Sequence, residues 1–245
     1  MKYEVLNKHY EILIKNIRQY FSESKNSIWD RRNKIKIISF HNEEITIKSF
    51  KVPHLINKIA YTFVRPSKAR RSYDNSLKIK EFVPKPIGYV EFKQKGLIFD
   101  SYFLCEKYNY DFTIRDPLTE TLFSDKENIF EQFAAFTYAL HQKGVEHLDY
   151  SPGNILVKKI SDGIYEFKII DVNRMKFKML TNVERLENFS KLWARENDLI
   201  CIIEAYAKIS KIAKDEAIAI ALEASQKHKD KVNLKKKLKG KKIVN

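Results

Sequence analysis

Apolar and polar positions follow two different periods along the chain, and they predict a sheet-rich first half and a helical second half. Residues 3–21 repeat apolar side chains near every 3.6 positions, which predicts an amphipathic helix. Two β-like runs follow at 35–40 and 45–52, and the polar residues 41–44 between them indicate a hairpin.

A second helix and a second hairpin follow the first. Ser67 is a suitable N-cap for a helix over 67–82, which carries apolar residues along one face. Two further strands, 86–93 and 97–106, flank a turn at 94–96. The order strand, strand, helix, strand, strand predicts a small antiparallel sheet with one main helix.

From residue 127 the pattern becomes helical. Residues 127–145 form a long apolar-periodic helix, and Gly144 stands at a typical position just past a helix end. A polar loop at 147–154, a strand pair around the turn 161–163 and further helix complete the chain. We therefore predict an α+β fold with four parts: an N-terminal helix (1–26), a sheet-rich lobe (27–107), a mainly helical lobe (108–228) and a basic tail (229–245).

Composition supports a folded protein in a reducing compartment. The chain has 245 residues, of which 44% are hydrophobic, enough for a core without disulfides. Cys105 and Cys201 lie far apart in apolar segments, so we expect buried thiols. No run reaches the length of a membrane span and the first residues lack the apolar core of a signal peptide. We expect a soluble cytoplasmic protein.

Positive charge is concentrated at the carboxyl end. The formal net charge is +15, and the last twenty residues, with nine Lys and one Asp, contribute +8 of it. Such a segment can be a solvated end, or it can be attracted to an anionic membrane surface or to nucleic acid. Because the chain has no zinc spacing, aromatic RNA-binding motif or recognition helix, no nucleic acid partner is expected.

The loop 147-HLDYSPGN-154 combines the side chains needed for phosphoryl transfer. A carboxylate at Asp149 can orient a hydroxyl and accept its proton, while the amide of Asn154 and the carboxylate of Asp171 can hold a divalent metal on phosphate oxygens. Such Mg²⁺ sites use few protein oxygens and complete their shell with phosphate and water. His147 is interpreted as a residue that holds the loop, not as the base.

These motifs resemble those of protein-kinase-like phosphotransferases, with HLDYSPGN as the catalytic loop and Asp171 in IIDVN as the metal ligand. The strand 45-ITIK-48 is similar to the kinase strand that carries the phosphate-binding lysine. The resemblance implies a two-lobed fold with ATP and Mg²⁺ between the lobes, and these roles: phosphate contact by Lys48, an acidic partner for it at Asp74 or Glu81, and adenine contact by the backbone of Glu106 to Tyr108.

A closer resemblance is to the lipopolysaccharide kinase family, which phosphorylates Kdo or heptose sugars. It rests on the segments 48-KSFKVP-53, 65-RPSKARRSYDN-75, 84-PKPIGYVE-91 and 171-DVNR-174 together with the catalytic loop. It implies ATP-dependent phosphorylation of a sugar hydroxyl on a lipopolysaccharide core or lipid A acceptor. The implied location is the cytoplasmic face of the inner membrane, with peripheral contact to an anionic surface.

The chain departs from the kinase pattern at several points. No glycine-rich loop precedes the first hairpin, and Arg31, Arg32 and Asn33 stand where it belongs, so their side chains are candidates for phosphate contact. Asn173 replaces the flexible glycine after Asp171, which argues against a large activation-loop movement. Three other functions stay open: a soluble small-molecule kinase of the aminoglycoside or choline type, a protein Ser/Thr kinase, and a non-catalytic binding module.

Overall fold

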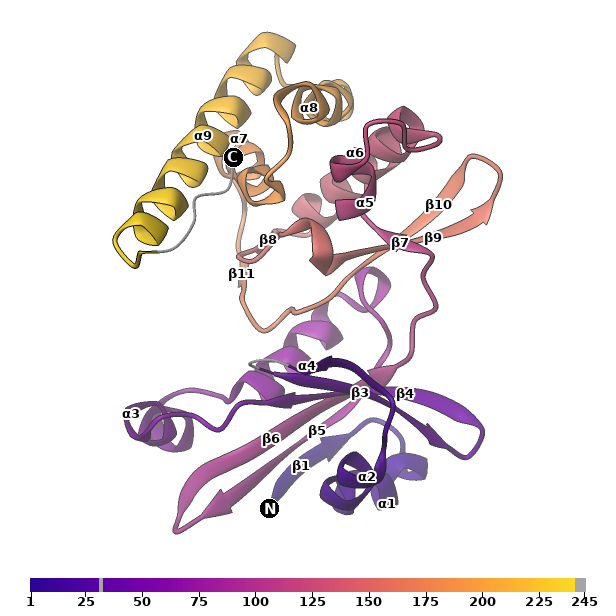
Figure 1. Ribbon diagram of the computed structural model, residues 1–245, viewed down its shortest axis with the longest axis vertical. Helices are drawn as coiled ribbons and strands as arrows, with labels where there is room; N and C mark the ends of the chain where they lie inside the picture. The colour runs from indigo at the N-terminus through magenta and orange to yellow at the C-terminus, as the bar shows by residue number, and fades with distance from the viewer. Residues whose placement is uncertain (31–32, 241–245) are drawn as a thin grey trace. The chain divides into compact units, whose positions relative to one another are not determined.

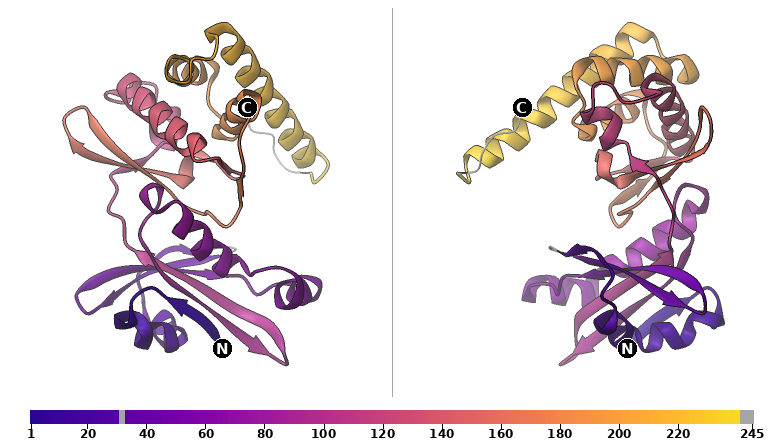
Figure 2. Two further views of the ribbon diagram at one scale, coloured as in Figure 1. Left: turned by 180° about the vertical axis from the view of Figure 1, so that it is seen from behind. Right: turned by 45° about the vertical axis from the view of Figure 1, so that its right-hand side comes forward.

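The computed structural model describes residues 1–30 and 33–240 and divides into two compact units (Figures 1 and 2). The N-terminal unit comprises Met1–Asn109 together with Asp171–Arg174. The C-terminal unit comprises Tyr110–Ile170 and Met175–Asn245. Asp171 therefore belongs to the unit that contains Lys48.

The N-terminal unit is built on one antiparallel sheet of six strands in the order β1-β5-β6-β4-β3-β2. Both predicted hairpins are present, as β3–β4 and β5–β6, and β4 pairs with β6 so that the two hairpins lie side by side. The strands are β1 (Lys2–Val5), β2 (Ser27–Asp30), β3 (Lys34–Phe40), β4 (Glu43–Phe50), β5 (Pro86–Gln94) and β6 (Leu97–Glu106).

The first residues do not form the single helix that was predicted over 3–21. They form the edge strand β1, which pairs with β5, and then the short helices η1 (Lys8–Tyr10), α1 (Glu11–Lys15) and α2 (Ile17–Glu23). The helix is interrupted at Asn16, whose side-chain amide donates to the Ile12 carbonyl. The apolar residues that suggested one helix are still buried, because they cover one face of the sheet: Leu13, Ile14 and Ile17 pack with Ile45, Ile47 and Leu104.

The opposite face of the sheet is covered by the predicted helix α4 (Lys68–Lys78), followed by the turn η3 (Lys80–Phe82). Ser67 caps α4 as expected, since its hydroxyl accepts from the Arg70 N–H at 3.1 Å. Between the two hairpins the structure also has a helical segment that the pattern did not predict, α3 (Leu55–Ile59) continued by a π-helical turn, η2 (Ala60–Val64). The core on this face consists of Phe50, Ala69, Tyr73, Tyr89, Phe103 and Cys105.

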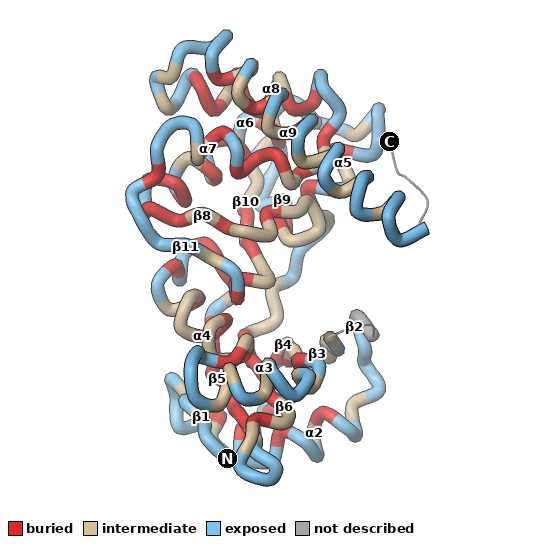
Figure 3. Tube along the Cα trace, turned by 90° about the vertical axis from the view of Figure 1, so that its left-hand side faces the viewer, coloured by how far each residue is buried: buried red, intermediate tan, exposed pale blue. Residues whose placement is uncertain are grey.

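The C-terminal unit is mainly helical, as predicted. The long helix α6 (Lys126–Gln142) is followed by Gly144 at φ +69°, a conformation that favours glycine. Figure 3 shows buried residues along α6 and along the strand β8 that follows it. The other helices are α5 (Arg115–Thr119), α7 (Asn182–Asn188), η5 (Phe189–Leu192), α8 (Glu196–Ser210) and α9 (Lys214–Lys237).

Two small sheets lie around the 147–154 loop of this unit. The strand pair predicted around residues 161–163 is present as β9–β10, and β7 extends it to three strands. A second pair joins β8 to β11 on either side of the loop. The strands are β7 (Phe112–Thr113), β8 (Val145–His147), β9 (Ile155–Ser161), β10 (Ile164–Ile169) and β11 (Met175–Phe177), and η4 (Pro152–Asn154) is a 3₁₀ turn within the loop.

Within the predicted basic tail (229–245), the structure describes residues 229–240, and most of these continue a helix. Helix α9 continues through Lys237, because lysine and leucine are good helix formers. The Lys229 ammonium donates to the Ala194 carbonyl at 2.8 Å, which ties this part of α9 to its unit. No helix in the described part of the chain is long and apolar enough to cross a bilayer.

Candidate active site

Lys48 lies on the sheet face that α4 covers. It stands on β4 opposite Phe103 of β6, and only 13% of its side chain is exposed. Its ammonium lies 2.8 Å from Oδ1 of Asp171. Because the pair is mostly shielded from water, its attraction is screened less than that of a surface pair.

The segment that carries Asp171 is fixed by α4. The side-chain amide of Asn75 donates to the Val172 carbonyl at 2.7 Å, and Val172 and Asn173 are buried. The Asn173 amide donates to the Asp171 carboxylate. Asp171 itself has φ +58°, a left-handed conformation that a non-glycine residue adopts only when its surroundings enforce it. Helix α4 therefore holds Asp171 against Lys48 through a backbone contact.

In the structure the carboxylate beside Lys48 is that of Asp171, not that of Asp74, the first predicted partner. Asp74 pairs instead with Arg70, one helical turn earlier, at 3.4 Å. Its side chain is 37% exposed and lies off the buried face of α4, so the helix does not direct it toward the sheet. Glu81 is exposed in the turn that follows α4. The carboxylate that Lys48 contacts is Asp171.

This arrangement predicts that Asn75, and not its neighbour Asp74, supports activity. Asn75→Ala removes one hydrogen bond to the Asp171 segment and should lower the free energy of unfolding by about 1 kcal/mol. Because a small misplacement of a catalytic group is costly, kcat should fall on the order of tenfold. Asp74→Ala is the matched control and should leave kcat within about twofold. Steady-state kinetics that ranked the two variants in the opposite order would contradict the assignment.

The backbone expected to meet adenine is partly engaged with the protein itself. The Glu106 N–H donates to the Lys85 carbonyl and the Lys107 N–H donates to the Glu44 carbonyl, both at 2.9 Å. The Glu106 carboxylate pairs with Lys85 at 2.6 Å. The backbone N–H groups of Glu106 and Lys107 are therefore already bonded within the protein and cannot donate to adenine. Of the backbone groups predicted to contact adenine, those left are the N–H of Tyr108 and the carbonyl groups of residues 106–108.

The 147–154 loop of the C-terminal unit, the predicted catalytic loop, is held by its own backbone and by His147. The ring of His147 is buried; Nδ1 accepts from the Asp149 N–H at 3.0 Å, and Nε2 lies 3.0 Å from the Ile170 carbonyl. A proton on Nε2 satisfies both contacts at once. His147 therefore orients the loop, as the sequence indicated.

Asp149 and Asn154 are presented with free oxygen atoms. The Asn154 side-chain nitrogen donates to the Asp149 carbonyl at 2.9 Å, which turns the amide oxygen of Asn154 away from that bond. The Asp149 N–H and carbonyl are both used within the loop, whereas no described residue hydrogen-bonds to its carboxylate. A carboxylate that is partly exposed and not engaged can accept a proton from a bound hydroxyl.

Buried side chains fasten this loop to the helices. The Tyr150 hydroxyl lies 2.8 Å from the Thr137 hydroxyl on α6, and both residues are fully buried. Asn188 donates to the His147 carbonyl at 2.9 Å and contacts His141, whose pKa is lowered to about 4 by burial. His141 is therefore neutral near pH 7, and the loop is anchored without a buried charge.

Lys191 is a residue near the loop that the sequence pattern did not single out. It lies on η5, where burial lowers the pKa of its ammonium while the negative charges of Glu146 and Asp149 oppose that change. The chain thus places a cation within electrostatic range of Asp149. Nothing in its local sequence marks Lys191, because the contact depends on how η5 packs.

The predicted Mg²⁺ ligands, Asn154 and Asp171, belong to different units of the chain. In the described ranges, no three His, Cys, Asp or Glu side chains gather as a metal site. Asn154 and Asp171 are hard oxygen donors, and Mg²⁺ bound to a nucleotide needs only one or two of these from protein. Arg31 and Arg32, the expected phosphate contacts, lie outside the described residues.

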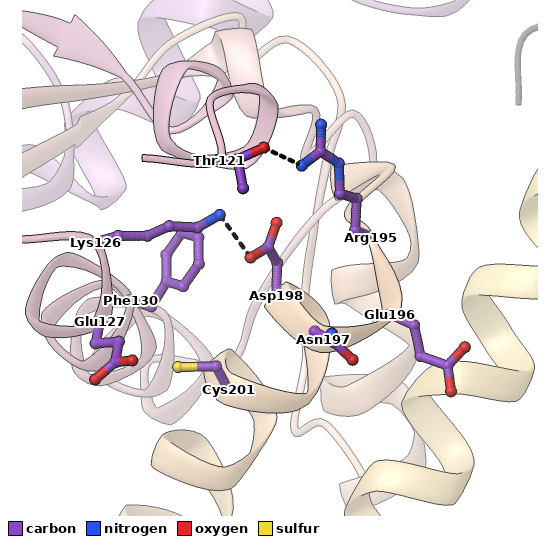
Figure 4. Close-up of a pocket in the computed structure, with 9 residues that line it drawn as sticks. All are labelled: Thr121, Lys126, Glu127, Phe130, Arg195, Glu196, Asn197, Asp198 and Cys201. Atoms are coloured by element: carbon purple, nitrogen blue, oxygen red, sulfur yellow. Dashed lines mark hydrogen bonds and ion pairs between the residues drawn. The ribbon is translucent and has the colours of Figure 1, made fainter. Parts of the chain in front are cut away.

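A separate pocket of about 440 Å³ lies in the C-terminal unit at the beginning of α8 (Figure 4). There Lys126 pairs with Asp198 at 2.7 Å, and Arg195 donates to the Thr121 hydroxyl at 3.0 Å. The ion pair joins the beginnings of α6 and α8, and the Arg195 bond joins the residue before α8 to the segment before α6. Neither Asp149 nor Asn154 lines this pocket.

Comparisons with known proteins agree with the resemblance seen in the sequence. The model of the lipopolysaccharide kinase (Kdo/WaaP) family matches residues 73–215, more than half of the chain, a range that contains Asp149, Asn154 and Asp171. A solved structure described as "WaaP in complex with acyl carrier protein" is similar, with a TM-score of 0.61 and 14% identity over 94% of this chain and 99% of that chain. No curated protein sequence matches. The likeness to the solved structure confirms the predicted kinase-like fold.

Proposed function

Since this chain belongs to the lipopolysaccharide kinase (Kdo/WaaP) family, and is therefore a phosphotransferase that acts on sugar hydroxyls, we propose that it transfers the γ-phosphoryl group of ATP to a Kdo or heptose hydroxyl. The observation that carries this proposal is the 2.8 Å ion pair between Lys48 and Asp171, on a segment that α4 holds in place. It supplies a fixed cation beside a metal-binding carboxylate, which is what a nucleotide phosphate requires.

Asp149 orients the acceptor. Its unengaged carboxylate accepts a hydrogen bond from the sugar hydroxyl and takes the proton as the new oxygen–phosphorus bond forms. The bond from the γ-phosphorus to the bridging oxygen breaks, and ADP leaves with the negative charge. The Lys191 ammonium interacts electrostatically with Asp149 and stabilises the negative charge of the phosphoryl group that is transferred.

Lys48 and Asp171 of the N-terminal unit supply the nucleotide-binding groups. The Lys48 ammonium would neutralise phosphate oxygens, and the Asp171 carboxylate would serve as a ligand for Mg²⁺. The amide oxygen of Asn154, in the C-terminal unit, is the other Mg²⁺ ligand that the sequence predicts. A bound Mg²⁺ would offset the charge of the β- and γ-phosphates. The protein contributes position and charge, and such groups account for most of the catalysis of phosphoryl transfer.

The acceptor is a glycolipid at an anionic membrane surface. The net charge of +15 favours approach to phosphorylated lipids, and α9 adds a lysine-rich helix end with exposed Leu234. Each basic side chain near such a surface contributes about 1 kcal/mol. This supports peripheral membrane contact on the cytoplasmic side.

An acceptor panel tests the proposal. Purified enzyme with Mg²⁺ and γ-labelled ATP should label a glycolipid ending in Kdo or in heptose, and the rate should identify which sugar is used. A soluble aminoglycoside, choline and a protein mixture serve as alternative acceptors. Transfer only to one of these would favour a small-molecule or protein kinase, whereas binding without any transfer would favour a non-catalytic module.

A further inference from the structure

The helical segment Leu55–Val64, formed by α3 and η2, exposes an apolar face. It stands at the sheet of the N-terminal unit, away from α1 and α2 (Figures 1 and 2). Phe63 is 74% exposed and Ile56 is 83% exposed, values that are high for such side chains in a soluble domain. The exposed apolar residues of this segment are Leu55, Ile56, Ile59, Phe63 and Val64.

The rest of the segment is attached to the protein. Lys58 lies over the ring of Phe99 at 5.1 Å, and the Thr62 hydroxyl accepts from the Ile98 N–H at 3.0 Å. These two residues are one turn apart and contact β6. The segment therefore packs through one side and presents its apolar face to solvent.

Next to this segment lies a pocket of about 500 Å³ that we call the cationic pocket. Its lining residues all belong to the N-terminal unit, and none of the described residues that line it is acidic. Its basic lining residues are Lys51, His54, Arg65, Lys68, Arg71 and Arg174. A cavity with this lining selects an anion.

The cationic pocket contains a donor that the protein does not satisfy. Nε of Arg71 is buried and makes no hydrogen bond to a described residue. Burial lowers the pKa of Arg71; Tyr61 opposes this change, and the neighbouring charges of Arg65 and Arg174 lower the pKa further. Clustered cations repel one another, and this repulsion destabilises the empty pocket. A bound anion would offset the repulsion and would accept a hydrogen bond from Arg71.

The apolar face and the cationic pocket share one structural element. Asn57, Tyr61 and Arg65 line the pocket and lie four residues apart along the segment. The exposed apolar residues of the segment stand at positions that do not line the pocket. An element with apolar side chains on one face and cations beside it is typical of segments that lie in the interface of a membrane.

We propose that the cationic pocket binds the phosphate of a phosphorylated lipid while the apolar face of Leu55–Val64 enters the acyl region of the bilayer. The source of the anion is a lipid headgroup, because the apolar face would have no partner around a free phosphate ion. This proposal rests on the proposed function in one respect, because it takes the glycolipid acceptor as the natural ligand. In this proposal the N-terminal unit binds a phosphate group of the lipid, which is a different group from the sugar hydroxyl that reacts.

Co-sedimentation of the full chain with vesicles tests this site without nucleotide. Vesicles of phosphatidylcholine with phosphatidic acid should bind the protein, and phosphatidylcholine alone should bind it weakly. The double variant Arg65→Gln/Arg71→Gln should lose about twenty-five-fold in affinity, from about fivefold per cation. Ile56→Ser/Phe63→Ser should lose about tenfold. The controls Lys208→Gln and Leu122→Ser, also at exposed positions, should change affinity less than about twofold.

Two further measurements separate lipid from soluble phosphate. Excess inorganic phosphate should weaken vesicle binding more than chloride at equal ionic strength but should not release the protein completely, because the apolar face keeps its contact with the bilayer. The variant Phe63→Trp should show a blue-shifted emission on vesicle binding, which reports entry into the bilayer. Complete release by inorganic phosphate, an unshifted emission, or equal losses in the site variants and the controls would each overturn the proposal. Since none of these readouts uses ATP, a failure here is distinguishable from failure of the proposed kinase activity.

Discussion

Replacing Asp149 with alanine is expected to lower kcat for phosphoryl transfer on the order of a thousandfold and to leave nucleotide affinity nearly unchanged. The loop should survive the change, because its internal bonds at this position use the Asp149 N–H and carbonyl and not the carboxylate. The variant therefore loses the group that takes the proton from the acceptor hydroxyl while the metal ligands remain. Single-turnover transfer and nucleotide titration measure the two effects separately.

Asp162→Ala is the matched control for this prediction. Asp162 is a fully exposed carboxylate in the β9–β10 turn, where it pairs with Lys159 at 2.6 Å. Its removal should leave kcat within about twofold, because exposed ion pairs contribute little. Wild-type turnover in Asp149→Ala would show that the acceptor is oriented by another group.

Asp171→Ala should act on nucleotide binding first. It removes a predicted Mg²⁺ ligand, so affinity for ATP in the presence of Mg²⁺ should fall on the order of a hundredfold, with little change when Mg²⁺ is chelated. It also leaves the mostly buried Lys48 ammonium without its carboxylate, which should lower the free energy of unfolding by about 1–3 kcal/mol. Calorimetric titration and chemical denaturation measure these two effects.

The double variant Lys48→Met/Asp171→Ala separates the structural from the functional role of this pair. In Asp171→Ala the Lys48 cation is left unpaired, whereas the double variant has no cation at this position. The double variant should therefore have a higher free energy of unfolding than Asp171→Ala. Nucleotide affinity should not return, because both the phosphate contact and the metal ligand are then missing. Unchanged affinity for ATP and Mg²⁺ in Asp171→Ala would show that the metal is held elsewhere.

The elements predicted correctly are those whose signal is local. The β3–β4 and β5–β6 hairpins, α4 with its Ser67 cap, and α6 with Gly144 follow from side-chain period and from turn and cap chemistry. The candidate catalytic loop could be proposed from the sequence because its polar residues are close together in the chain. Its anchoring through His147 follows from the same short segment.

The predictions that failed depend on contacts distant in the sequence. Residues 3–21 have helical periodicity, yet their first residues complete a sheet edge against β5. Asp74 was chosen by its position on a helix, but the rotation of α4 places Asn75 against the Asp171 segment. The helical segment of α3 and η2 was not predicted, although its apolar residues Leu55, Ile59 and Phe63 lie four positions apart.

The most direct test of the account is transfer of the γ-phosphoryl group from ATP to a purified Kdo-containing lipid A acceptor in the presence of Mg²⁺. The wild-type chain and Asp149→Ala are compared, with a reaction that lacks acceptor as the blank. We predict label in the glycolipid sugar with the wild-type protein and a loss on the order of a thousandfold with the variant. Equal labelling by both proteins, or no transfer to any Kdo or heptose acceptor by a wild-type protein that binds ATP, would contradict it.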